Sequence, residues 1–160
     1  MKPLPNIEEL VGKLQAFGIR IPPGKVTVGV FGDSAALSEQ LLSLIRAGRK
    51  RGGTSLLWAH EFERQAIPEV GDIEIVVDHR DEPALVTRVV KVQVLPFNEV
   101  GAEFAAREGE GDSSLAYWRE AHRAYFDREC SRVGRKASEA MPVVCSSFDV
   151  LNVVPESQGD

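Results

Sequence analysis

The chain has 160 residues, of which 43% are hydrophobic, and this length and composition suit one domain with a substantial core. Its formal net charge of −5 argues against bulk non-specific DNA binding, which depends on neutralising many phosphates. No apolar run approaches a membrane span, and the first residues carry acids and prolines where a signal peptide needs an apolar core, so we expect a cytoplasmic protein.

The first part of the chain predicts two helices separated by a strand. An amphipathic helix is expected over residues 6–17, with Asn6 as its cap and Gly18 as its end. Alternating hydrophobicity then predicts a strand over 26–31. A leucine-rich helix follows and ends at Gly48.

The middle of the chain is rich in predicted strands. Runs of β-branched and other apolar residues predict strands over 54–58, 73–78 and 84–97. The last of these is long enough to bend and to serve two parts of one sheet. Asn98 is expected to cap a short helix that follows this strand.

The last third of the chain predicts one long helix and one strand. The helix begins at Asp112 or Ser113 and extends to about Val133, and the strand covers 143–154. Helices and strands are segregated along the chain, which favours the α+β class, with an antiparallel barrel-like sheet flanked by helices.

Turn and tail composition divides the chain into three predicted parts. Residues 1–24 are expected to form an N-terminal helical extension, residues 25–155 the main domain and residues 156–160 a polar tail. The extension ends in a proline-rich turn, which is typical of a linker.

The most informative segment concentrates positive charge where a loop enters a predicted strand. Its basic residues are Arg46, Arg49, Lys50 and Arg51. No acid occurs between Glu39 and Glu61, although the protein as a whole is acidic. Such a site suits an anionic or electron-rich ligand, and nucleic acid is the obvious candidate. A helix C-terminus followed by a glycine stop explains the same residues without a ligand.

Four short motifs occur in a defined order along the chain. They are Gly48-Arg49-Lys50 after the leucine-rich helix, Val70-Gly71-Asp72 before a strand, Leu95-Pro96-Phe97-Asn98-Glu99-Val100 with Phe104-Ala105 and Glu108-Gly109-Glu110-Gly111-Asp112 after it, and Leu115-Ala116-Tyr117-Trp118-Arg119-Glu120-Ala121-His122 with Phe148 in the last strand. With these motifs, the chain resembles the ASCH domain family, a branch of the PUA-like superfamily, over about residues 30–153. The resemblance implies a small PUA-like β-barrel with helices around a cleft, and recognition of RNA or nucleotides.

The resemblance also implies candidate catalytic residues. In relatives that hydrolyse N4-acetylcytidine, a Lys, a Thr and a Glu carry the reaction, and Lys50 and Glu108 match the first and the last. The family signature Gly-x-Lys-x-x-Thr/Ser implies a hydroxyl three positions after the Lys. This chain has Gly53 at that position, and hydroxyls follow at Thr54 and Ser55. A one-residue bulge brings Thr54 into place; alternatively, the nucleophile is missing and the protein only binds.

Our hypothesis for amide hydrolysis assigns Lys50 as base, Thr54 as nucleophile and Glu108 as proton shuttle. Two cationic neighbours of Lys50 favour its neutral form. This hypothesis requires Lys50 and Glu108 to meet across one solvent-open crevice.

RNA cleavage is an alternative use of the same residues. Glu108 then takes the proton of a 2′-hydroxyl, while Lys50 stabilises the charge on the phosphate. Arg49 and Arg51 are expected to hold neighbouring phosphates, with Ser55 as a further substrate contact. Trp58 and Trp118 are expected to stack on bases if they are exposed. A third alternative is an RNA-binding module without chemistry. We therefore expect a protein that recognises RNA or a modified nucleoside, with hydrolytic activity left open.

No cofactor and no histidine-based zinc site are expected. A divalent cation between Glu108, Glu110 and Asp112 is the open alternative, and otherwise Asp112 caps the long helix. Trp118 and His122 fall at helical spacing, so we assign them to packing. The two cysteines, Cys130 and Cys145, match no zinc or redox spacing and are predicted to be reduced thiols.

Overall fold

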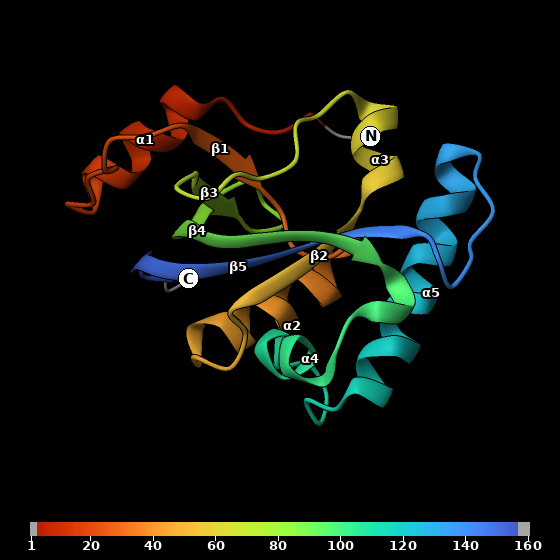
Figure 1. Ribbon diagram of the computed structural model, residues 1–160. Helices are drawn as coiled ribbons and strands as arrows, with labels where there is room; N and C mark the ends of the chain where they lie inside the picture. Colours follow the sequence, from red (N-terminus) through yellow and green to blue (C-terminus); the bar gives the residue numbers. More distant parts are fainter. Residues whose placement is uncertain (1–2, 157–160) are drawn as a thin grey trace. The chain divides into compact units, whose positions relative to one another are not determined.

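The computed structural model describes residues 3–156, which form an α+β fold (Figure 1). The elements in chain order are α1 (Ile7–Ala16), β1 (Val26–Gly29), α2 (Ala35–Arg46), β2 (Gly52–Leu56), α3 (Leu57–Glu63), β3 (Ile73–Val77), β4 (Pro83–Pro96), the 3₁₀ helix η1 (Phe97–Glu99), α4 (Ala102–Glu108), α5 (Leu115–Val133) and β5 (Pro142–Val153).

The strands form one mixed sheet in the order β1-β3-β4-β5-β2. β1 pairs with β3 in parallel, whereas β3 pairs with β4, and β2 with β5, in antiparallel fashion. The predicted α+β class is confirmed. The closed antiparallel barrel is not: among the described residues β1 and β2 each have one strand neighbour, so the sheet is open, and the long connection between β1 and β3 allows parallel pairing.

The chain divides into two compact units, each with its own core. Within the described residues, the first contains 3–48, 70–90 and 148–156, and the second contains 49–69 and 91–147. β4 and β5 supply residues to both units, which agrees with a long strand serving two parts of a sheet. The domain boundary proposed at residue 24 stays a prediction, and residues 157–160 of the proposed tail lie outside the described part of the chain.

The first unit has helices on both faces of β3. Side chains of a strand alternate between faces, so Ile73 and Ile75 lie on one face and Val76 on the other. Leu10 of α1 packs with the two isoleucines, and Ile45 of α2 packs with Val76. The first helix is therefore part of this core.

The helix starts show where the predicted boundaries were right and where they were wrong. The side chain of Asn6 accepts hydrogen bonds from the first turn of α1, as predicted. The long helix α5 is capped by Ser114, not by Asp112 or Ser113. The short helix α4 begins after Gly101, and Asn98, the predicted cap, lies within the separate 3₁₀ turn η1.

The second unit is built around the buried face of α5. Trp118, His122, Phe126 and Cys130 recur every four residues, so they lie on one side of the helix, and all four are buried. Three of them join a core with residues of β2, α4 and β5, including Cys145. Both cysteines are free and buried, as predicted.

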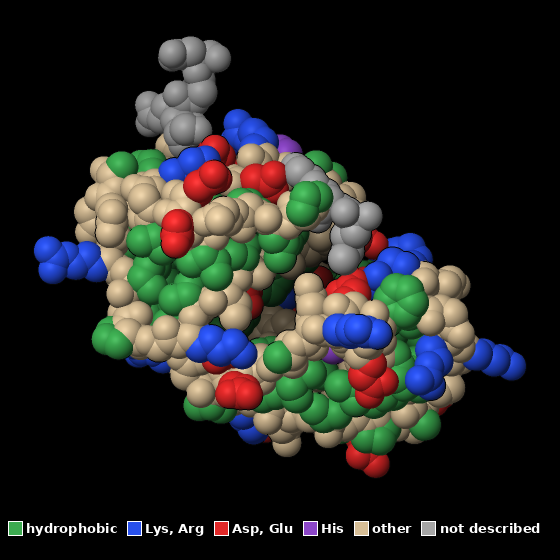
Figure 2. Space-filling model, turned by 90° about the horizontal axis from the view of Figure 1, so that it is seen from above, with side chains coloured by type: hydrophobic (Ala, Val, Ile, Leu, Met, Phe, Trp, Pro, Cys, Tyr) green, Lys and Arg blue, Asp and Glu red, His purple; other side chains and the backbone are tan. Residues whose placement is uncertain are grey.

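The face of the protein drawn in Figure 2 carries charges of both signs in small groups. On the face drawn in Figure 2, basic and acidic side chains lie beside one another. This distribution suits a local binding site better than the neutralisation of many phosphates. No helix within residues 3–156 combines the length and apolar character needed to cross a bilayer.

Candidate functional site

Two short backbone contacts in the second unit bring Lys50 and Glu108 together. Lys50 lies just before β2 and Glu108 ends α4. The backbone N–H of Arg51 donates to the carbonyl of Arg107 at 2.8 Å. Gly109 ends α4 with a φ of 64°, and a Cβ at this position would overlap the carbonyl oxygen of Arg49. Only glycine therefore allows the two segments to approach so closely.

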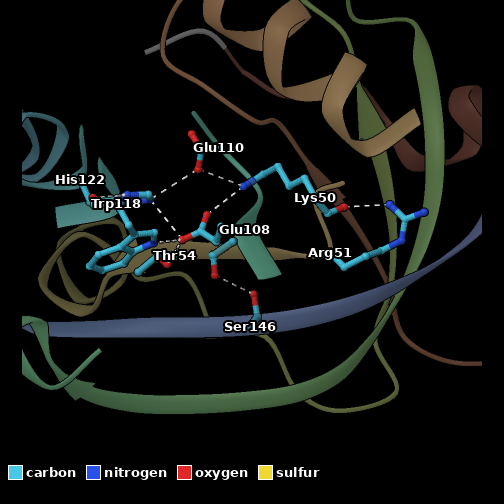
Figure 3. A network of polar contacts seen from close by, with 9 residues as sticks. Lys50, Arg51, Thr54, Glu108, Glu110, Trp118, His122 and Ser146 are labelled. Atoms are coloured by element: carbon cyan, nitrogen blue, oxygen red, sulfur yellow. Dashed lines mark hydrogen bonds and ion pairs between the residues drawn. The ribbon is translucent and has the colours of Figure 1, made fainter. Parts of the chain in front are cut away.

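The carboxylate of Glu108 is the centre of a polar cluster (Figure 3). Lys50 Nζ lies 2.8 Å from Glu108 Oε1. The other oxygen, Oε2, accepts from Thr54 Oγ1 at 2.6 Å and from Trp118 Nε1 at 2.5 Å, and it lies 3.2 Å from His122 Nε2. One carboxylate thus joins a hydroxyl, an indole, an imidazole and an ammonium group.

The cluster is buried, which corrects the expectation of a solvent-open crevice. Lys50 is 2% exposed and Glu108 is 1% exposed. Burial is possible because the ion pair and the additional donors satisfy both charges. A second carboxylate, Glu110, lies 3.3 Å from Lys50 Nζ with a side chain that is 16% exposed. Glu110 and Thr54 are half-buried and are therefore more accessible than Lys50 and Glu108.

The charges in the cluster shift three pKa values. Burial works to raise the pKa of Glu108, but Lys50 and His122 outweigh it and hold that pKa well below its usual range. Burial raises the pKa of Glu110, helped by the nearby Glu108 charge and opposed by Lys50. Burial lowers and Glu108 raises the pKa of His122, and the net direction is upward. At neutral pH the cluster therefore holds an ionised Glu108.

Thr54 reaches Glu108 without a bulge. The pairing of β2 with β5 is regular from Gly52 to Leu56. Because side chains alternate along a strand, Thr54 lies on the same face as Leu56, which packs in the core with α4 and α5, and opposite to Gly53. Cys145 is its cross-strand partner, and burial raises the pKa of this thiol to about 12. The hydroxyl of Thr54 is thus present in the cluster.

The predicted substrate-binding residues are not all brought to this cluster. Ser55 points to the other face of β2, where its Oγ lies 2.7 Å from His60 Nε2 on α3. Trp58 is covered by the guanidinium of Arg135, 4.9 Å from its ring centroid, and packs against the core. Arg51 donates to the carbonyl of Lys50.

The remaining predicted position, Arg49, is exposed beside the cluster, since its carbonyl lies against Gly109. His60 belongs to helix α3, where the sequence predicts the end of a strand and the loop after it.

The sequence assigns His122 and Trp118 to packing, with base stacking by an exposed Trp118 as the alternative. The structure places both residues in the cluster, and Trp118 is only 2% exposed, which corrects the stacking alternative. Their rings stack with centroids 4.3 Å apart, and both contact Glu108. The available signal was a histidine within the apolar stripe of a helix, since a buried imidazole needs a polar partner.

The side chains of Glu108, Glu110 and His122 each offer an atom that could ligate a metal, and these atoms lie within 4.8 Å of one another. Asp112, the third predicted ligand, is exposed and accepts a hydrogen bond from the backbone N–H of Ser114. This trio is the set within residues 3–156 that could hold a metal ion. Lys50 already contacts both carboxylates, and its charge opposes a divalent cation there.

Comparisons with known proteins place the chain beside ASCH domains. The sequence model of the ASCH domain matches residues 27–152. The crystal structure of an ASCH domain from Lactobacillus crispatus JV V101 is 33% identical, with a TM-score of 0.74 over 79% of each chain. A protein from Enterococcus faecalis V583 is 28% identical, with a TM-score of 0.75 over 92% of this chain and 91% of that one. No curated protein matches the sequence.

Proposed function

The chain belongs to the ASCH domain family, and from this premise we propose that it recognises a modified cytosine nucleoside, free or within RNA, and hydrolyses the acyl group on its N4 amine. The proposed site is the cluster of Lys50, Thr54 and Glu108. A neutral nucleoside suits an acidic protein better than long RNA does, because it needs no extended phosphate contacts.

The observation that carries the proposal is the hydrogen bond from Thr54 Oγ1 to Glu108 Oε2 at 2.6 Å. A threonine hydroxyl is a weak nucleophile until a nearby base takes its proton, and this carboxylate is ionised and within reach. Lys50 contacts the other oxygen of the same carboxylate at 2.8 Å. The geometry therefore favours Glu108 as the proton acceptor, with Lys50 as a fixed positive charge.

The proposed reaction has two halves. Thr54 Oγ attacks the acyl carbon while its proton moves to Glu108, and the ammonium of Lys50 stabilises the negative charge on the acyl oxygen. The bond between the acyl carbon and N4 then breaks, and the proton passes from Glu108 to N4. Water hydrolyses the acyl-threonine in the second half, with Glu108 accepting the water proton and returning it to Thr54.

The test is incubation with N4-acetylcytidine, with cytidine and acetate measured by chromatography. Thr54→Val removes the hydroxyl at nearly constant volume, and we expect the rate to fall by about 10²–10⁴-fold. Ser55→Ala, on the opposite face of β2, is the matched control and keeps the wild-type rate. Wild-type turnover by Thr54→Val refutes the assignment of the nucleophile.

The burial of Lys50 and Glu108 favours a second candidate, an RNA-binding module in which the ion pair is structural. In this case the protein retains single-stranded RNA with salt-dependent affinity and releases no acetate. Offering the labelled RNA in the same experiment separates retention from deacetylation and from strand cleavage.

A further inference from the structure

We propose that His122 is the proton store of this site, a positioning residue that acts through Glu108. It holds the proton lost by Thr54 during attack and returns it through Glu108 to the leaving amine. This inference rests on the proposed function and gives a chemical role to a residue to which neither the sequence motifs nor the comparisons assign one.

Hydrogen bonding fixes which nitrogen of His122 titrates. Nδ1 lies 2.9 Å from the backbone carbonyl oxygen of Trp118. A carbonyl oxygen can only accept, so Nδ1 carries a hydrogen in both charge states of the ring. Nε2 is therefore the atom that gains and loses a proton, and it lies 3.2 Å from Glu108 Oε2. Stacking on Trp118, with planes 17° apart, holds the ring in this orientation.

The same carboxylate oxygen faces both the nucleophile and the imidazole. Glu108 Oε2 accepts from Thr54 Oγ1 at 2.6 Å and faces His122 Nε2. Glu108 alone is a poor final acceptor, because several donors stabilise its charge and keep its pKa low. A neutral imidazole is a far better final acceptor near neutral pH.

The proton transfers balance over one cycle. As the bond from Thr54 Oγ to the acyl carbon forms, the hydroxyl proton passes to Glu108 Oε2 and then to His122 Nε2. When the bond from the acyl carbon to N4 breaks, the proton returns by the same path to N4. Water repeats both transfers in the second half of the reaction, and the net change is hydrolysis of one amide. His122 can accept this proton only if its ring is neutral at the start of the cycle.

The groups around the ring determine when His122 is neutral. Glu108 and Glu110 face Nε2 at 3.2 and 3.9 Å, and Lys50 contacts both carboxylates. Cys145, near Thr54, stays a thiol. The carboxylates favour the charged ring and raise the pKa of His122 above its ordinary value. Activity is therefore expected to rise with pH through a value above about 6.5.

The test compares pH–rate profiles for N4-acetylcytidine in three proteins. We expect wild-type activity to rise through a pKa above about 6.5. His122→Gln keeps a hydrogen-bonding side chain but cannot titrate, so we expect a loss of about 10²–10⁴-fold and no rise in this range. His60→Gln, a change to another histidine of the same unit, keeps both the rate and the profile.

Each outcome bears on a defined part of the proposal. A His122→Gln protein with the wild-type rate and profile overturns the proton store while leaving the amidase proposal intact. A wild-type protein that releases no cytidine overturns both.

NMR titration of ¹⁵N-histidine in the wild-type protein adds a readout that does not depend on folding of the variant. It should show Nδ1–H in the neutral ring and a raised pKa at Nε2. In Glu108→Gln that pKa should fall, because one of the two facing carboxylates loses its charge. A ring that titrates at or below the ordinary value in the wild-type protein contradicts the inference.

Discussion

Replacing Lys50 by methionine tests whether the buried ion pair holds the second unit together. Methionine is a flexible apolar side chain of similar length, so the substitution removes the ammonium with little change in volume. The carboxylate of Glu108 then stays buried without its cationic partner. We expect the free energy of unfolding to fall substantially.

The expected loss of stability depends on the contacts that Glu108 keeps when the ammonium of Lys50 is removed. Removing one partner of a buried ion pair destabilises a protein by about 3–5 kcal/mol. Because Thr54, Trp118 and His122 still contact the carboxylate, we expect the lower end, about 3 kcal/mol. For a domain of this size that loss lowers Tm by roughly 6–12 °C.

Urea unfolding followed by circular dichroism at pH 7 measures the effect, with the exposed Lys136→Met as control. The pKa of Glu108 is lower in the folded than in the unfolded protein, so its contribution is complete above the unfolded value of about 4.3 and is lost as the pH falls. The difference between Lys50→Met and wild type should thus be smaller at pH 3 than at pH 7. A midpoint shift no larger than that of the control would refute the role assigned to the ion pair.

Three further substitutions probe the contacts around this pair. The pKa of Glu110 is raised on folding, so stability is lost as pH rises through that pKa. Glu110→Gln should therefore unfold at a higher urea concentration than wild type at pH 8 but not at pH 4. A variant that gains stability at pH 4 and not at pH 8 contradicts this. Gly109→Ala should lower the free energy of unfolding by well over the roughly 1 kcal/mol expected for Gly134→Ala. Both glycines have a positive φ, but only Gly109 lies against backbone atoms of another segment. Equal shifts in Tm for the two variants would be inconsistent with this close approach. Trp118→Phe removes the indole donor to Glu108, and we expect the free energy of unfolding in urea to fall by about 1.5–3 kcal/mol. An unchanged urea midpoint would show that this hydrogen bond contributes nothing to stability.

The family resemblance was needed to pair Lys50 with Glu108, and Glu108 was identified by its place at the end of the short helix after the long strand. Burial of the pair could not be deduced, since charged residues are almost never buried unless partners satisfy them. Those partners include Trp118 and His122, whose spacing on α5 is the same as that of ordinary core residues. Helical periodicity identifies a buried face and does not tell which polar group that face meets.

Two errors in the fold have local explanations. The sequence predicts a strand at the start of α3, because Leu56, Leu57 and Trp58 continue the apolar run of β2 and no side chain caps the helix. The parallel pairing of β1 with β3 depends on sheet order, which hydrophobic alternation within one strand does not encode.

The two buried thiols provide a way to time the opening of one half of the protein. Cys130 and Cys145 both belong to the second unit, and the chain has no other cysteine. Burial raises the pKa of each thiol, so alkylating reagents react only when the surrounding structure opens. The alkylation rates of the two thiols under native conditions therefore report transient exposure beside the Glu108 cluster. Slower alkylation in the presence of substrate would show that the substrate binds, without any measurement of turnover.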